Sequence, residues 1–113
     1  MKVAQSTMLS PELAREAENL GTLLARLRLA RGVKQREAAL RAGMSRNSAY
    51  RLERGDPGLA IGQIQRYLEA IAPGKTLLEL LSQADPALIT LGAREKKRRV
   101  RDMTRAELDD LDF

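Results

Sequence analysis

The stretch from Gln35 to Gly55, QREAALRAGMSRNSAYRLERG, decides the fold of this chain. It contains two short runs of helix-forming residues, and Gly43 lies between them. A glycine favours the left-handed conformation that ends many helices, and a serine such as Ser45 can cap the first turn of the next helix. The stretch therefore predicts helices at about 34–42 and 45–54, joined by a tight turn.

Three alanines characterise the first of these helices. Ala38, Ala39 and Ala42 are small enough to let a second helix pack closely against it. A second helix can enter the major groove of DNA only if the first helix packs closely behind it and the turn is tight. The pattern therefore predicts a helix-turn-helix whose second helix lies in the major groove.

The composition favours a single helical domain. The chain has 113 residues, the length of one domain, and its hydrophobic fraction of 43% supports a modest core rather than a large enzyme cleft. Its apolar residues are mostly leucine and alanine, and the aromatic residues are Tyr50, Tyr67 and Phe113. Such a composition favours helices over sheets, so we expect an all-α fold.

Cysteine and histidine are absent from the sequence. The chain therefore lacks thiolate and imidazole metal ligands and the Ser–His and Cys–His pairs of nucleophilic catalysis. No carboxylate pair or phosphate-binding loop is recognisable, and we expect no enzyme activity, no metal and no cofactor. The N-terminal sequence MKVAQSTMLSPEL has no apolar run long enough for a signal peptide or a membrane span, so we expect a cytoplasmic protein.

Positive charge is concentrated in two stretches, although the net charge is only +5. Residues 26–54 hold nine basic residues against two acidic ones, and residues 94–101 hold six against one. Residues 102–113 reverse the sign, with five acidic residues against one basic. A protein that binds DNA phosphates concentrates basic side chains in this way, and solvated helix faces are the alternative explanation.

Hydrophobic periodicity predicts further helices around the motif. Apolar residues recur at helical spacing from Leu20 to Leu27, from Ile61 to Ile71 and from Leu77 to Leu81. Ser10-Pro11-Glu12 predicts another short helix from 11 to about 19, because serine is a good N-cap and proline suits the first helical position. Gly21 leaves open whether this helix is continuous with the next.

The segment after Ser82 shows a weaker pattern. Arg94 to Arg101 has too few apolar residues to bury itself, so we expect a partly disordered tail. Thr104 and Glu107 match a capping box, which predicts a short helix at 105–112. We therefore divide the chain into an N-terminal extension with a short helix, a compact domain and a tail, at residues 1–19, 20–82 and 83–113.

Residues 20–55, LGTLLARLRLARGVKQREAALRAGMSRNSAYRLERG, resemble the helix-turn-helix of the phage-repressor-like family, also called Cro/C1 or XRE regulators. The resemblance reaches to about Leu81 and implies a compact five-helix lambda-repressor-like domain. The sequence departs from the family at Ala38 and Ala49, where larger aliphatic residues are usual. The positions that agree with the family's spacing are the Leu-Gly that opens the first helix, Arg28, Gly32, Gln35, Ala39, Gly43 and Glu53-Arg54-Gly55.

The resemblance implies that the helix at 45–54 reads DNA, with Arg46 and Asn47 at its start as the first base contacts. Arginine pairs with O6 and N7 of guanine, and asparagine pairs with N6 and N7 of adenine. Tyr50 and Arg51 follow at i+4 and share the same face, so we expect base contacts from them as well. Packing over Arg54 or a neighbouring helix is the alternative for Tyr50.

The expected phosphate contacts surround these base contacts. The resemblance assigns Gln35, at the start of the first motif helix, to a DNA phosphate together with the helix N-terminus. A first-turn polar residue without such a contact is the alternative. Ser48 suits a phosphate or a thymine-side contact. The complete expected set is Gln35, Ser45, Ser48, Lys34, Arg36 and Arg54.

The resemblance also implies a structural ion pair. Arg28 and Glu53 match a pair that, in the family, connects the first helix to the end of the recognition helix, so we expect neither to read bases. The apolar residues that we expect in the core are Leu20, Leu24, Leu27, Met44, Leu52, Ile64 and Leu68.

The leading interpretation is a repressor-like, sequence-specific transcriptional regulator of bacterial or phage type that binds double-stranded DNA. We expect a homodimer, because one recognition helix reads only a few base pairs and tight binding needs two half-sites. The sequence leaves three dimer surfaces open: the helix from Leu77 to Leu81, the N-terminal helix and the C-terminal helix.

Two alternatives concern other segments. ERGDPGLAIGQIQRYLEAI, residues 53–71, is similar to antitoxin-like members of the same family that accompany kinase-type toxins. This similarity implies a DNA-binding antitoxin whose C-terminal tail binds the toxin protein. A further interpretation makes the run from Arg94 to Arg101 a flexible arm that follows DNA phosphates or enters the minor groove.

Overall fold

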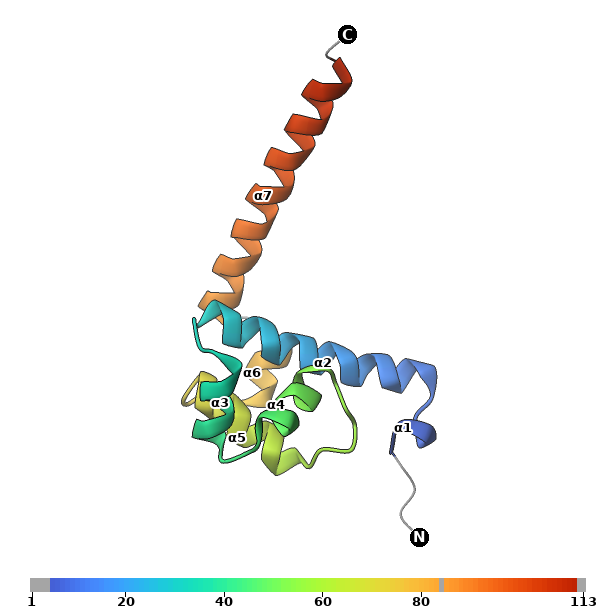
Figure 1. Ribbon diagram of the computed structural model, residues 1–113, viewed down its shortest axis with the longest axis vertical. Coiled ribbons are helices and arrows are strands. Elements are labelled where there is room, and N and C mark those ends of the chain that lie inside the picture. Colours follow the sequence, from blue (N-terminus) through green and yellow to red (C-terminus); the bar gives the residue numbers. More distant parts are fainter. Residues whose placement is uncertain (1–4, 84, 112–113) are drawn as a thin grey trace.

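The computed structural model describes residues 5–83 and 85–111, and for residues 6 and 102–111 it describes the backbone alone. All regular secondary structure in these residues is helical, which confirms the all-α prediction (Figure 1). The helices are α1 (Gln5–Met8), α2 (Pro11–Ala30), α3 (Gln35–Ala42), α4 (Arg46–Glu53), α5 (Ile61–Ile71), α6 (Leu77–Leu81) and α7 (Pro86–Leu111). Helices α2 to α6 form the expected five-helix domain.

Helix α2 is longer than either helix that the sequence predicted in this region. The side chain of Ser10 caps its start by accepting a hydrogen bond from the backbone N–H of Leu13 at 3.2 Å, and Pro11 follows. The helix then runs without a break through Gly21. The two segments that the sequence left open are therefore one helix, and the expected division at residue 20 falls inside it.

Two glycines let α2 lie directly against the chain that follows α4. A Cβ atom on Gly21 would lie 2.5 Å from the backbone nitrogen of Gly55, and a Cβ atom on Gly55 would lie 2.4 Å from Cα of Glu18. Gly55 also has a φ of 77°, a backbone conformation that residues other than glycine rarely adopt. This backbone-to-backbone contact fixes the end of α4 on α2.

The turn between α3 and α4 has the predicted form. Gly43 is left-handed, with a φ of 68°, and the N–H of Met44 donates to the carbonyl oxygen of Ala39 at 3.0 Å. The side chain of Ser45 then caps α4 by accepting from the N–H of Ser48 at 3.0 Å. The predicted glycine turn and serine cap are both confirmed.

The core lies among α2 to α6 and reaches the start of α7. Of the expected core residues, the leucines at 24, 27, 52 and 68 are buried, whereas Leu20, Met44 and Ile64 are partly buried against them. Tyr67 is fully buried and is the largest of the fully buried side chains. Ala38 and Ala49, the two positions that are smaller than the family's usual residues, are fully buried in the same cluster as Tyr67.

The prediction of a short helix confined to 105–112 is wrong in extent. Helix α7 begins at Pro86 and continues through the basic run to Leu111, and residue 112 lies outside the described residues. Its first turns are anchored, because Leu88 is buried in the core and Glu95 forms an ion pair with Arg26. The core therefore extends past Leu81.

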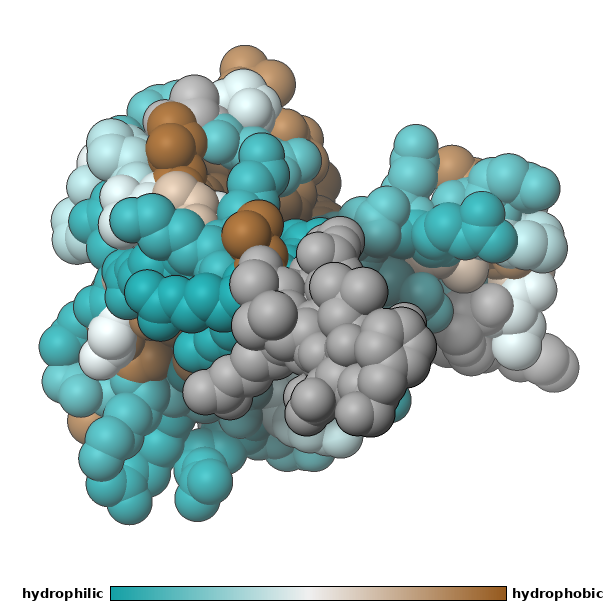
Figure 2. Space-filling view, turned by 90° about the horizontal axis from the view of Figure 1, so that it is seen from above, coloured by the Kyte–Doolittle hydropathy of each residue, from teal (hydrophilic) through white to brown (hydrophobic). Residues whose placement is uncertain are grey.

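The face of the molecule seen from above is mainly hydrophilic, with separate hydrophobic patches (Figure 2).

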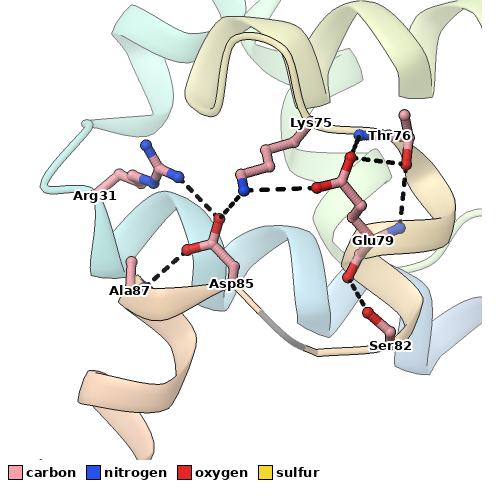
Figure 3. Close-up of polar contacts among 7 residues, drawn as sticks. All are labelled: Arg31, Lys75, Thr76, Glu79, Ser82, Asp85 and Ala87. Carbon is pink, nitrogen blue, oxygen red and sulfur yellow. Dashed lines mark hydrogen bonds and ion pairs between the residues drawn. The ribbon is translucent and has the colours of Figure 1, made fainter.

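A polar cluster attaches the start of α7 to the domain (Figure 3). The side chain of Asp85 is 3% exposed, and its Oδ2 lies 2.8 Å from Nη2 of Arg31 and 3.9 Å from Nζ of Lys75. Its Oδ1 accepts a hydrogen bond from the N–H of Ala87 at 2.8 Å. Burial raises the pKa of Asp85, but the Arg31 bond, the Ala87 N–H and the nearby positive charges outweigh it and leave the pKa lowered.

Among the described residues, no helix is long and apolar enough to cross a membrane.

Candidate nucleic-acid interface

Helix α4 has a buried face and an exposed face. Ala49 and Leu52 are buried, and α4 packs against α2 and α3. The four residues expected to contact bases are all exposed: Arg46, Asn47, Tyr50 and Arg51. Their spacing places them on the side of α4 that faces away from Ala49 and Leu52. The fold therefore supports α4 from behind and leaves its polar side open.

Ser45 and Ser48 are linked at the start of α4. In addition to the N-cap bond, the Ser45 hydroxyl donates to Oγ of Ser48 at 3.0 Å. This pair orders the first turn of α4, where Arg46 and Asn47 begin the exposed face. The expected phosphate contacts of the two serines stay predictions.

Arg51 is held by an acidic residue from the loop after α4. Its Nε donates to Oδ2 of Asp56 at 2.7 Å, while Oδ1 of Asp56 accepts from the N–H of Gly58 at 2.8 Å. The Gly58 N–H and then Arg51 lower the pKa of Asp56, so the carboxylate is charged at neutral pH. A guanine contact through the two Nη groups of Arg51 leaves this bond in place.

Tyr50 pairs with Arg54 one turn later. Nη1 of Arg54 donates to the Tyr50 hydroxyl at 3.0 Å, and Cζ of Arg54 lies 5.4 Å from the centre of the ring. This is the contact that the sequence offered as an alternative for Tyr50. Both side chains are exposed, so the base contact of Tyr50 and the phosphate contact of Arg54 stay predictions.

The predicted pair of Arg28 and Glu53 is present and nearly buried. Nε of Arg28 lies 2.6 Å from Oε2 of Glu53, and the side chains are 13% and 8% exposed. Nη2 of Arg28 donates to Oε1 of Glu53 at 3.1 Å, and Nη1 donates to the carbonyl oxygen of Val33 at 2.9 Å. The pair therefore connects α2, the loop before α3 and the last residue of α4. The hydrogen bond to Glu53 raises the pKa of Arg28, against the effect of burial.

Two more residues join this pair. Nε2 of Gln35 donates to Oε1 of Glu53 at 3.1 Å, and the Tyr67 hydroxyl donates to Oε2. Burial and the bond to Glu53 raise the pKa of Tyr67. The side chain of Gln35 thus ties the start of α3 to the end of α4, and its expected contact with a DNA phosphate stays a prediction.

Sequence reasoning missed the role of Tyr67. The available signal was its position, because Tyr67 lies three residues after Ile64 and four before Ile71, on the apolar side of α5. A buried tyrosine needs a partner for its hydroxyl, and Glu53 provides it.

The other expected phosphate contacts flank α4. Lys34 is the N-cap residue of α3 and forms no side-chain cap bond, and Arg36 is exposed in the first turn. Arg36 and Arg46 border one open depression between α3 and α4, together with Leu40, which is 79% exposed. Basic side chains thus lie on both sides of the turn. Among the residues with described side chains, no group of acidic residues is arranged to hold a metal ion.

Comparison with known proteins adds one match. A family model described as a helix-turn-helix domain matches residues 19–81, which is more than half of the chain and contains both motif helices and the Arg28–Glu53 pair. No curated protein and no solved structure matches the chain. The chain belongs to the helix-turn-helix domain family.

Proposed function

We propose that the chain is a sequence-specific, repressor-like transcriptional regulator of the XRE (Cro/C1) type that inserts α4 into the major groove. The exposed face of α4 carries this proposal, because it presents Arg46, Asn47, Tyr50 and Arg51 while Ala49 and Leu52 hold the helix from behind. Arginine and asparagine at the start of such a helix suit guanine and adenine edges. Helix α4 is therefore the base-reading element.

The phosphate-binding residues fit the same docking. The start of α3, with Lys34, Gln35 and Arg36, precedes α4, and Arg54 follows it. Free backbone N–H groups at a helix start attract phosphate, and basic side chains add the sequence-independent part of the affinity. We propose that a homodimer places two copies on half-sites about 34 Å apart in cytoplasmic DNA.

Selection of binding sites from random double-stranded DNA, followed by gel shift, tests this function. Arg46→Ala and Asn47→Ala should each lower discrimination at one base pair per half-site by about 1–3 kcal/mol, because each removes a base contact. Arg15→Ala is the matched control, since Arg15 is an exposed arginine on α2 outside the motif. An unchanged sequence preference in both α4 variants would show that another surface reads the bases.

The alternative is a DNA-binding antitoxin that also neutralises a partner protein, such as a kinase-type toxin. It is supported by α7, because the part of α7 beyond Glu95 extends away from α4 and stays accessible while α4 occupies DNA (Figure 1). This function requires a toxin gene next to the gene of this chain, and growth arrest when the chain's gene alone is deleted. Normal growth after that deletion contradicts it.

A further inference from the structure

Helix α7 extends well beyond its contacts with the domain. Asp85 and Leu88 are buried at its start, and the ion pair between Glu95 and Arg26, at 2.6 Å, lies near its middle. Beyond that pair the helix continues for sixteen residues to Leu111, which is about 24 Å of helix. Figure 1 shows this part extending away from the other helices, and it gives the molecule its long dimension of 65 Å.

The charge of α7 is divided along its length. Residues 94–101 hold six basic residues and one acidic, whereas residues 102–111 hold one basic and four acidic. All the basic side chains in the first segment are exposed. Two such helices in parallel would place like charges opposite each other, but two in antiparallel orientation would place each basic segment against an acidic one.

The acidic segment lies at the unfavourable end of the helix. The C-terminal end of a helix carries partial negative charge, so acidic residues there destabilise an isolated helix. Most of the stability of a helix in a protein also comes from packing of one of its faces rather than from helix propensity. A partner that offers a basic surface would offset both effects.

One side of α7 carries apolar residues between these charges. Val100 lies seven residues after Ala93 and eleven before Leu111, and both intervals are close to whole turns of the helix. Ala93 and Val100 are exposed. Lys96 and Lys97 lie one turn from both of these, and Glu107 lies one turn before Leu111. The charges of opposite sign thus border the same side of the helix.

We propose that α7 is the dimerisation element and that two copies of the chain pair their α7 helices in antiparallel orientation, with residues 94–101 of each against residues 102–111 of the other. When the basic segment of one copy lies against the acidic segment of the other, the two-fold axis passes near residue 102. Residues 93–111 of the two copies then lie side by side over about 28 Å of helix. This deepens the homodimer of the proposed function by assigning its surface. Because the paired area is small, the dimer dissociates on dilution.

Analytical ultracentrifugation of the full chain without DNA, over a wide range of concentration, tests this pairing. The first variant combines Lys96→Glu with Lys97→Glu, and the second is Glu107→Lys. Each places like charges opposite each other in both halves of the dimer, so each should sediment as a monomer where the wild type is a dimer. The first variant is compared with Arg98→Glu combined with Arg99→Glu, which makes the same charge change on the side of the helix away from Ala93, Val100 and Leu111 and should leave the dimer intact.

An equimolar mixture of the two variants gives the decisive result. In antiparallel pairing, each reversed segment of one variant meets the complementary segment of the other, so the mixture should recover the wild-type dissociation constant. Circular dichroism should show an unchanged domain unfolding transition in every variant, because the altered residues lie beyond Glu95.

Three results would overturn the proposal: a wild-type chain that is monomeric throughout, a dimer that both variants leave unchanged, or a mixture that stays monomeric. A dimer unchanged by both variants would place the interface elsewhere, for example at the exposed Leu78 and Leu81 of α6. Gel shift with a wild-type site, run in parallel, reports DNA binding separately. If the wild-type chain forms the dimer but binds no DNA, the proposed function is contradicted and the pairing of α7 stands.

Discussion

Glu53, the last residue of α4, is bound through both carboxylate oxygens by Arg28 of α2, with Nε to Oε2 at 2.6 Å and Nη2 to Oε1 at 3.1 Å. Gln35 of α3 and Tyr67 of α5 donate to the same carboxylate. Four helices thus meet at one side chain. The orientation of α4 relative to the rest of the domain therefore depends on this carboxylate.

Arg28→Ala is expected to lower the free energy of unfolding by about 3 kcal/mol, because it leaves a nearly buried carboxylate without its cation. Urea unfolding followed by circular dichroism measures this change. Arg41→Ala is the matched control: Arg41 pairs with Glu37 at 2.6 Å, but both side chains are about half exposed. The control should cost less than about 0.5 kcal/mol. Equal losses in the two variants would show that the burial of the Arg28 pair adds nothing.

Gly21→Ala is expected to destabilise the domain, because the added methyl group would meet backbone atoms of the chain from Leu52 to Gly55 at 2.5–2.7 Å. Backbone cannot rotate away as a side chain can, so α2 and α4 must separate, and a loss of about 1–3 kcal/mol is typical of such overpacking. The measurement is again urea unfolding.

Gly62→Ala serves as the control for this substitution. Gly62 also lies in a helix, but a Cβ atom there has no neighbour within 4 Å. Alanine should stabilise α5 by about 0.5–1 kcal/mol because it favours the helix. Opposite signs for the two substitutions are therefore expected, and a neutral Gly21→Ala would contradict the close approach.

The motif helices could be predicted from the sequence because their ends depend on residue type. Gly43 and Ser45 act through local backbone conformation and local hydrogen bonds, which a sequence displays directly. The bond between Gln35 and Glu53 could not be predicted in this way. It depends on how α3 and α4 pack and on one rotamer of each side chain, and sequence spacing does not specify either.

The extent of α7 was missed for a different physical reason. Residues 94–101 contain too few apolar residues to bury themselves, so the sequence predicted a partly disordered tail rather than a helix. The helix begins because Asp85 accepts from the N–H of Ala87, Leu88 is buried, and the charged residues that follow are good helix formers. The ion pairs of α7 with Arg31 and Arg26, both distant in sequence, anchor the helix that contains this run, and sequence spacing does not reveal them.

The lowered pKa of Asp85 predicts a loss of stability in acid. Burial raises this pKa, but Arg31, the Ala87 N–H and Lys75 together leave it below the ordinary value. The folded chain therefore holds the carboxylate charged more strongly than the unfolded chain does. The resulting stability is present above the unfolded pKa of about 3.9 and is lost as the pH falls through the lower folded value.

Asp85→Asn should remove this dependence. At neutral pH the variant should be less stable than the wild type, and the difference should shrink as the pH is lowered below about 4. Urea unfolding across a pH series measures both free energies. Because other carboxylates such as Asp56 titrate in the same range, the difference between the two proteins, rather than either curve alone, is the readout. A constant difference at all pH values would contradict a role for the Asp85 charge.

The bond between Arg51 and Asp56 predicts an effect on base selectivity without a large effect on stability. Both side chains are partly exposed, at 43% and 32%, so Asp56→Asn should change the free energy of unfolding by less than about 1 kcal/mol. Asparagine keeps an oxygen for the Gly58 N–H but loses the charge that holds the Arg51 guanidinium. The Arg51 side chain then has to be ordered when DNA binds, which should weaken the proposed base contact of Arg51.

Gel shifts on sites that differ at the base pair read by Arg51 measure this effect. Arg51→Ala should reduce the discrimination by about 1–3 kcal/mol, and Asp56→Asn should reduce it partly at the same base pair. Removing a negative charge near DNA also raises affinity for every sequence, so the ratio of affinities is compared rather than either affinity. If Asp56→Asn keeps the full ratio at the base pair where Arg51→Ala loses it, the carboxylate does not position Arg51 for recognition.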